Sequence, residues 1–195
     1  MINVAMGDPA VYAKRRQENS MKHVMIALVV SLAVVAPSAA LAQTPAKVVV
    51  LASDIPVART PPGFWKTFPA PVLARCTEPL APGAPDLRGV WTGDNDGKTH
   101  VERIQQCGDR VVIEGGGVTH DMRADGILAH GVDDIAAGSA RPIKVAAVFE
   151  NNGLSLKPFG GPTRVTRVLQ GDVLVFNYNG KVIQLRRIAA LPPGL

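Results

Sequence analysis

The chain has 195 residues, with 21 lysines and arginines against 16 aspartates and glutamates and a formal net charge of +5. Residues 1–42 hold four of the basic and two of the acidic residues, so the remainder carries only +3. This charge is too small and too scattered to indicate a nucleic-acid-binding protein, which gathers Lys and Arg on one face, and the remaining length suits a single domain.

Residues 21–42 have the order of a secretory signal peptide. Met21-Lys22-His23 supplies a positive end, residues 24–36 form an apolar run, and Ala40-Leu41-Ala42 is a small-x-small cleavage site. A membrane-spanning helix needs about 20 apolar residues, more than this run provides. We therefore predict that residues 1–42, an N-terminal extension and a cleavable signal, are removed before Gln43. The predicted localisation is periplasmic or secreted, with no membrane span after cleavage.

Residues 43–85 form a predicted leader that is rich in proline. Proline lacks a backbone donor and fixes φ, so this stretch is neither a central strand nor a long helix. Its apolar groups, Val48–Leu51 and Phe64-Trp65, favour an extended segment packed along the rest of the domain over a flexible tether, which is the alternative. The nine prolines are Pro45, Pro56, Pro61, Pro62, Pro69, Pro71, Pro79, Pro82 and Pro85.

Cys76 and Cys107 are the two cysteines of the chain, and both follow the predicted cleavage site. Two cysteines allow one intramolecular pairing, and disulfides persist outside the cytoplasm. We predict a structural disulfide that ties the leader to the following domain. No cysteine or histidine spacing indicates a metal site, and no motif indicates a cofactor.

From Asp86 the sequence changes to short β-branched runs separated by turns. Asn179-Gly180 is a strong hairpin signal because both central positions of a type I′ turn need positive φ. Apolar residues alternate within the runs, and no helical period is evident. The pattern predicts an all-β fold, a small antiparallel up-and-down barrel of eight or nine strands over residues 86–195. The clearest strands are 87–92, 99–106, 110–114, 143–150, 154–158, 165–169, 173–178 and 181–188, with a further one possible at 118–123.

The sequence Gly89-Val90-Trp91 at the start of this domain resembles the first strand of lipocalins and related calycins. In that family the tryptophan closes one end of the barrel and an arginine packs across it. The resemblance implies these structural roles for Trp91 and for Arg186 or Arg187, with a cation–π contact between them. The predicted barrel is shorter than in that family and no helix follows it, so side chains can fill the interior. Small periplasmic inhibitors of metalloproteases and of lysozyme are a rival comparison.

The polar segment 119–123 supplies candidate ligand-binding residues. Neighbours in a strand point to opposite faces, so His120 is expected to share a face with Met122, and Asp121 with Arg123. His120 can orient a polar ligand, although an ordinary loop histidine explains it as well. The candidate ligand-binding residues are His120, Arg123, Phe176 and Tyr178.

Two further polar groups have simpler interpretations. His100 and Glu102 share a strand face with Ile104. One interpretation is that this face lines an interior, but we expect it to be solvated. Residues 94–97, Asp-Asn-Asp-Gly, lack the closing glutamate of a calcium loop and are better explained as a turn. No serine, threonine or cysteine has a recognised nucleophile signature, so no catalytic residue is predicted.

The leading functional hypothesis is an exported, non-enzymatic protein that binds a small apolar or amphipathic ligand in the barrel. The alternative is a module that binds an envelope protein, such as a protease or lysozyme inhibitor. In that reading the leader makes the contact, with Phe64 and Trp65 as aromatic anchors.

Overall fold

The computed structural model describes residues 48–61, 63, 65–135 and 142–191. The predicted signal peptide and Phe64 lie outside these ranges. Within them, no helix has the length and hydrophobicity that crossing a bilayer requires.

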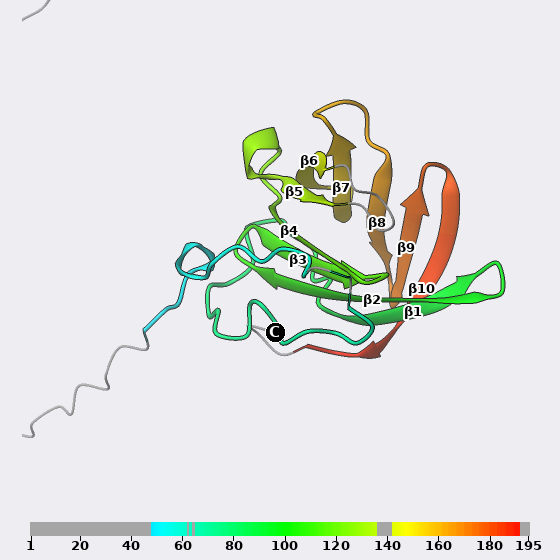
Figure 1. Cartoon of the computed structure of the whole chain (residues 1–195), viewed down its shortest axis with the longest axis horizontal. Helices are drawn as coiled ribbons and strands as arrows, with labels where there is room; N and C mark the ends of the chain where they lie inside the picture. Colours follow the sequence, from blue (N-terminus) through cyan, green and yellow to red (C-terminus); the bar gives the residue numbers. More distant parts are fainter. Residues whose placement is uncertain (1–47, 62, 64, 136–141, 192–195) are drawn as a thin grey trace, which may run out of the picture. The chain divides into compact units, whose positions relative to one another are not determined.

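Ten antiparallel strands form one sheet (Figure 1). Along the sheet the order is β4-β3-β2-β1-β10-β9-β8-β7-β6-β5. All chain neighbours except β4 and β5 pair in the sheet, and β1 and β10 pair although they are far apart in the chain. The strands are β1 (Gly89–Asn95), β2 (Lys98–Cys107), β3 (Arg110–Gly115), β4 (Val118–Arg123), β5 (Val132–Ile135), β6 (Pro142–Glu150), β7 (Gly153–Pro158), β8 (Val165–Gln170), β9 (Val173–Tyr178) and β10 (Lys181–Ala189).

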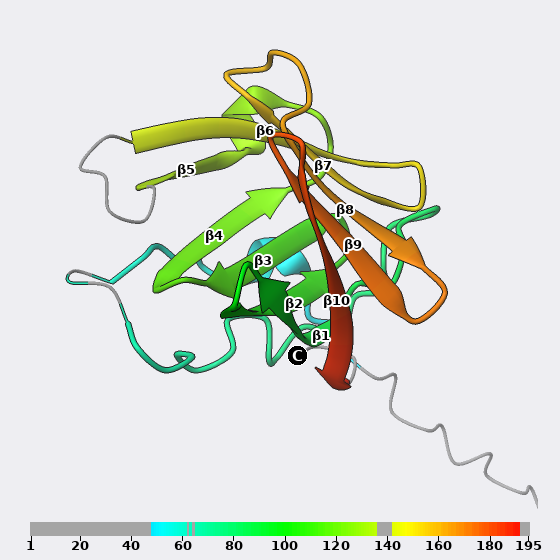
Figure 2. The ribbon, with the colours of Figure 1, turned by 90° about the vertical axis from the view of Figure 1, so that its right-hand side faces the viewer.

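Of these two exceptions, the β1–β10 pairing closes the barrel and the missing β4–β5 pairing leaves it open. β1 pairs with β10, which joins the first strand to the last. Gly93 permits this contact, because a β-carbon there would collide with the carbonyl oxygen of Gln184. β4 and β5 are consecutive in the chain, yet they stand at opposite ends of the sheet order and face each other without pairing (Figure 2). We call this unpaired junction between β4 and β5 the seam.

The predicted all-β barrel is confirmed, with ten strands in place of eight or nine. The additional strand is β5, in a region that the sequence leaves ambiguous. Helical structure among the described residues is limited to two short 3-10 turns, η1 (Ala52–Asp54) and η2 (Leu128–His130). Positive φ at Asn179 and Gly180 confirms the type I′ turn, and Asn151 and Asn152 adopt the same conformation between β6 and β7.

The interior is filled by side chains that alternate along the strands. Trp91 is fully buried at one end, where its indole N–H donates to the carbonyl of Leu87 over 2.8 Å. The guanidinium carbon of Arg187 lies 4.5 Å from the centre of the Trp91 ring. Other members of this core include Leu87, Ile104, Val111, Ile113, Met122, Val132, Val145, Ala147, Leu154, Leu174, Phe176, Ile183 and Leu185.

The leader lies against the outer face of β2, β3 and β4. Arg110 on β3 is its main anchor, since its guanidinium donates to the carbonyl oxygens of Ala52, Ile55 and Pro56 over 2.6–2.8 Å. The side-chain oxygen Oε1 of Gln105 on β2 accepts a 2.9 Å hydrogen bond from the backbone N–H of Leu73. The leader is therefore part of the domain wall, with its own small apolar cluster against the sheet.

Cys76 and Cys107 are joined in a disulfide, with their Cα atoms 6.2 Å apart. Because Cys107 ends β2, the bond ties the leader to the sheet, as the two-cysteine count predicts.

Candidate functional site

A pocket of about 400 Å³ lies at the seam. Leader residues 52–59 form one wall, and residues 129–132, which enter β5, form another. The remaining wall comes from β3, β4 and the turn before β3. The lining residues are Ala52, Ser53, Ile55, Val57, Ala58, Arg59, Asp109, Arg110, Asp121, Met122, Arg123, Ala129, His130, Gly131 and Val132.

The pocket reaches the hydrophobic core. Met122 of β4 and Val132 of β5 line it, and both are buried members of the barrel core. In a fully paired sheet, neighbouring strands lie about 4.8 Å apart and leave no such opening. The missing β4–β5 ladder therefore gives the pocket its apolar lining.

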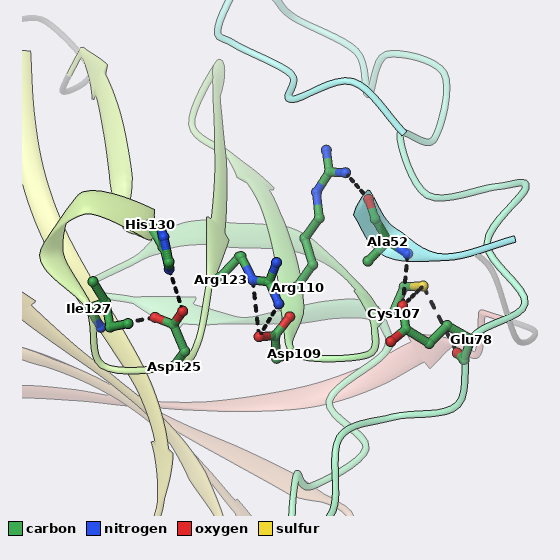
Figure 3. A network of polar contacts seen from close by, with 9 residues as sticks. All are labelled: Ala52, Glu78, Cys107, Asp109, Arg110, Arg123, Asp125, Ile127 and His130. Carbon is green, nitrogen blue, oxygen red and sulfur yellow. Dashed lines mark hydrogen bonds and ion pairs between the residues drawn. The ribbon is translucent and has the colours of Figure 1, made fainter. Parts of the chain in front are cut away.

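Three pairs of a basic and an acidic side chain lie along the pocket, and Figure 3 shows two of them, Arg123 with Asp109 and His130 with Asp125. Arg110 binds Asp121 through two bonds of 2.8 and 2.6 Å, and this pair is almost completely buried. Arg123 contacts Asp109 at 2.8 Å. The imidazole Nδ1 of His130 lies 2.6 Å from a carboxylate oxygen of Asp125, the second residue of the β4–β5 connection.

The His130–Asp125 pair holds a charged carboxylate near the seam. Partial burial tends to raise the pKa of Asp125, but the contact with His130 and the N–H of Ile127 outweigh it and lower that pKa below its usual range. The N–H of Gly126 donates to the carbonyl of Ala147 at 2.7 Å, which fixes this connection against β6. His130 is thus positioned by its contact with Asp125, which lies in a connection that is itself bonded to β6.

Arg123 is the most exposed cation of the three pairs, with 49 % of its side chain accessible. Its Nε and Nη2 both donate to one oxygen of Asp109, at 3.0 and 2.8 Å. These bonds do not use Nη1, which retains two donors. The pocket therefore combines an apolar floor with an accessible donor at its rim, a combination suited to an amphipathic molecule with an acceptor or anionic group.

The structure separates the four predicted ligand-binding residues. Arg123 points outward to the seam pocket, whereas His120 shares the inner face of β4 with Met122, as the alternation predicts. Phe176 is buried inside the barrel, and Tyr178, at the end of β9, has 56 % of its surface exposed. Of these four residues, Arg123 alone lines the seam pocket.

The expectation that His100 and Glu102 lie on a solvated face is wrong. Glu102 is 1 % exposed and binds Arg167 of β8 through two 2.8 Å bonds that cross the barrel interior. The ring of Phe176 lies against both partners of Glu102: the His100 ring stacks on it with centres 5.2 Å apart, and the Arg167 guanidinium carbon lies 4.5 Å from its centre. The face turns inward because the sheet curls closed, which strand alternation alone does not reveal.

Electrostatics explain how a carboxylate is tolerated there. Burial by itself raises the pKa of Glu102, but attraction to Arg167 and hydrogen bonds from His100 and Arg167 more than offset it and lower the pKa to about 2. Glu102 is therefore ionised at neutral pH and balances the charge of Arg167. Nη1 of Arg167 is buried and has no acceptor among the described residues.

Trp91 and Arg187 occupy the positions that the lipocalin resemblance implies, since they pair across β1 and β10 and the guanidinium covers the ring. Arg186, the other candidate, is exposed. It lines a second pocket of about 570 Å³ beside the Trp91 end, together with Arg187, Asp86 and residues of the β8–β9 turn. Arg187 is already engaged by Trp91 and by the carbonyl of Asp86. None of the residues that line this pocket is buried, whereas the seam pocket is lined by the buried core residues Met122 and Val132.

Trp65 is half-buried. Its backbone N–H donates to the carbonyl of Gly117, and its indole N–H donates to the hydroxyl of Thr119 over 3.3 Å. It also packs on Phe68, with ring centres 5.4 Å apart. The indole is therefore engaged with β4.

Two groups of potential metal ligands lie among the described residues, and neither is arranged as an ion site. The backbone N–H of Gly97 donates to the side chain of Asp94, which is the turn expected for residues 94–97, and Lys181 pairs with Asp96. Cys76, Cys107 and Glu78 bring three potential donors within 4.8 Å of one another, but the two sulfurs are bonded to each other.

Neither a comparison with protein-family models nor a search of curated proteins finds a match to this chain. The nearly closed barrel and the Trp91–Arg187 contact are compatible with a lipocalin-like fold.

Sequence reasoning missed most of the seam pocket. No motif in the sequence indicates Arg110, Val132 or His130, and strand alternation places Met122 only on the face of His120. A signal exists for the connection, because Asp125-Gly126 marks a turn and His130 follows five residues after the aspartate. No local signal shows that this turn faces leader residues 52–59.

Proposed function

We propose that this chain is an exported, non-enzymatic protein that binds a small amphipathic ligand in the seam pocket. The observation that carries the proposal is a cavity of about 400 Å³ in which the buried Met122 and Val132 lie close to the accessible guanidinium of Arg123. Ligand sites in proteins typically have volumes of about 300–1,000 Å³ and place a few polar groups in a mainly apolar lining.

The seam suits a ligand better than the barrel interior does. The Arg167–Glu102 pair crosses that interior at bond distance, and the surrounding core is filled by side chains. In the seam pocket the apolar part of the ligand lies on Met122, Val132 and Ile55, and its anionic or acceptor group meets Nη1 of Arg123. Export is supported by the signal-like residues 21–42 and by the disulfide.

The test is native mass spectrometry of the mature chain, purified without refolding, followed by titration with a fluorescent fatty acid. We expect saturable binding that Arg123→Gln weakens about tenfold, because a charge-assisted hydrogen bond contributes roughly 1.5–3 kcal/mol. Ala129→Trp, which fills the pocket from its wall, should abolish binding.

Arg75→Gln is the matched control, since Arg75 is exposed outside the pocket lining and its loss changes net charge equally. The proposal is wrong if Arg123→Gln and Ala129→Trp bind the probe as the unaltered chain does. Equal weakening by Arg75→Gln would instead indicate nonspecific charge attraction.

Binding of a protein partner through the leader stays a second proposal, supported by the exposed apolar residues Val48 and Val57. Deleting the leader is not a suitable test, because it would uncover Arg110 and Gln105, whose partners are leader backbone groups. Trp65→Ala is a better test than deletion. If this variant folds normally but no longer binds a protein partner that the unaltered chain binds, the result favours protein binding over the small-ligand proposal.

A further inference from the structure

Three apolar side chains form a small exposed surface beside the seam pocket. Ile127 and Phe159 are 50 % and 72 % exposed, and the half-buried Leu128 follows Ile127 as the first residue of η2. A β-carbon at Gly160 would lie 3.9 Å from Leu128 Cδ2, so the β7–β8 loop touches the β4–β5 connection. We call Ile127, Leu128 and Phe159 the lip. Both loops lie at the upper edge of the barrel in the two ribbon views (Figures 1 and 2).

Phe159 is held in an unfavourable backbone conformation. Its φ is +54°, in the left-handed region that glycine and asparagine tolerate and a bulky residue disfavours. The conformation is fixed locally, because the N–H of Phe159 donates to the carbonyl of Lys144 at 2.8 Å and the two following N–H groups bond back to Lys157 and Pro158. The fold thus accepts strain at a residue whose side chain gains little burial, which indicates a role outside the fold.

Basic side chains flank the lip. Lys144, whose carbonyl fixes Phe159, is exposed, and Arg164, at the far end of the same loop, is also exposed. The carboxylate nearest to Ile127, that of Asp125, is already bonded to His130. Lys144 stands opposite Asp133 in the register of β5 and β6, whereas Arg164 forms no ion pair within the described residues. The lip therefore presents apolar groups beside one cation, Arg164, whose charge is not balanced by a bonded acid.

We propose that the lip, with Arg164, docks this protein on an anionic lipid bilayer. Exposed aromatic and aliphatic side chains insert shallowly into the headgroup region, and neighbouring lysines and arginines are attracted to anionic lipids. The lip adjoins Ala129, His130 and Gly131 of the seam pocket, so a docked molecule has its pocket beside the membrane surface.

A bilayer fits this surface better than a protein partner does. A stable protein interface buries about 800 Å² on each side, far more than three side chains supply. Shallow membrane docking needs only a few anchors and cations. The docking proposal does not depend on a ligand in the seam pocket, and the two are measured separately.

The experiment is co-sedimentation of the mature chain with two kinds of vesicle, phosphatidylcholine alone and an equal mixture with phosphatidylglycerol. We expect partitioning onto the anionic vesicles only. Arg164→Gln should weaken it about fivefold, and high salt should weaken it further.

Phe159→Gly separates docking from folding. Glycine adopts the positive φ without strain, so the variant should melt at the same temperature or ~2–4 °C higher, whereas vesicle binding should fall about tenfold. Ile188→Ala removes a 62 %-exposed apolar group on β10 and should leave vesicle binding unchanged.

Absence of partitioning, or equal partitioning of Phe159→Gly and the unaltered chain, overturns the proposal. A concentration-dependent dimer that Phe159→Gly abolishes, without vesicle binding, would assign the lip to a second copy. Capture of a periplasmic protein without vesicle binding would assign it to a protein partner and likewise refute docking.

Discussion

At the scale of single residues, the Glu102–Arg167 pair shows how the barrel tolerates charge in its interior. The two side chains come from β2 and β8, which are not sheet neighbours, and their bidentate contact spans the space that the strands enclose. Removing one partner of such a pair leaves the other charge buried without a counter-charge, which typically lowers the free energy of unfolding by 3–5 kcal/mol. The pair therefore stabilises the closed sheet only while both charges are present.

Glu102→Gln should lower the free energy of unfolding by roughly 3 kcal/mol at neutral pH. Because the pKa of Glu102 falls from 4.5 to about 2 on folding, its contribution is complete above about pH 4.5 and is lost as the pH drops toward 2. Urea unfolding from pH 7 to pH 2 should show the two curves converging at low pH.

Glu150→Gln is the control for that comparison. Glu150 pairs with Lys157 at 3.5 Å with about a third of each side chain exposed, so its loss should change stability by less than about 1 kcal/mol. A constant difference between Glu102→Gln and the unaltered chain at every pH would show that the ionised carboxylate is not the source of the effect.

At the scale of elements, the leader protects the unpaired edge of β4. The hydroxyl of Thr60 donates to the carbonyl of Thr119 at 3.2 Å and accepts its N–H at 3.0 Å, in the manner of a neighbouring strand. The N–H of Ala58 donates to Asp121 two residues along, at 2.8 Å. Open strand edges invite pairing with other chains, so this cover explains how the sheet stays unpaired at the seam without exposing β4.

Thr60→Val keeps the shape of the side chain and removes both bonds. We expect the free energy of unfolding to fall by about 1–3 kcal/mol, because two backbone groups of Thr119 lose their partner. Size-exclusion chromatography over a range of concentrations should also show self-association through the uncovered edge. Thr163→Val, at an exposed position in the β7–β8 loop, should change neither quantity. Unaltered stability and a strict monomer for Thr60→Val would refute the edge-protection argument.

At the scale of the whole molecule, one covalent bond joins the two parts that the sequence distinguishes. The disulfide holds the leader at Cys76 and the sheet at Cys107. Close to it, Glu78 accepts the N–H of Ala52, and Val50 accepts the N–H groups of Thr77 and Glu78. The leader wall of the seam pocket is thus fastened at residues 76–78.

Replacing both cysteines by serine should lower the free energy of unfolding by roughly 3–4 kcal/mol, the chain-entropy value for a loop of this length. The cysteines lie 31 residues apart. Denaturant curves of the variant and of the unaltered chain measure the difference. Thiol titration of the unreduced, unfolded chain should find none; two free thiols would contradict the tether.

The sequence predicts the sheet well because strands and hairpins are local. Alternation in β6 and β9 and the Asn179-Gly180 turn require only neighbouring residues, and the positions of Trp91 and of Cys76 with Cys107 follow from a motif and a count of two. The seam could not be predicted in this way. Whether β4 pairs with β5 depends on how the sheet curls, and no residue of either strand encodes that by itself.

The sequence by itself determined an all-β barrel, its main turns, one disulfide and the inward and outward faces of β4. Only the tertiary structure decided that Glu102 lies inside, that the leader is a wall of the domain, and that Arg123 meets Met122 and Val132 beside a pocket. The physical reason is range: backbone dihedrals and side-chain alternation act over a few residues, whereas burial and ion pairing join groups such as Glu102 and Arg167, 65 positions apart in the chain.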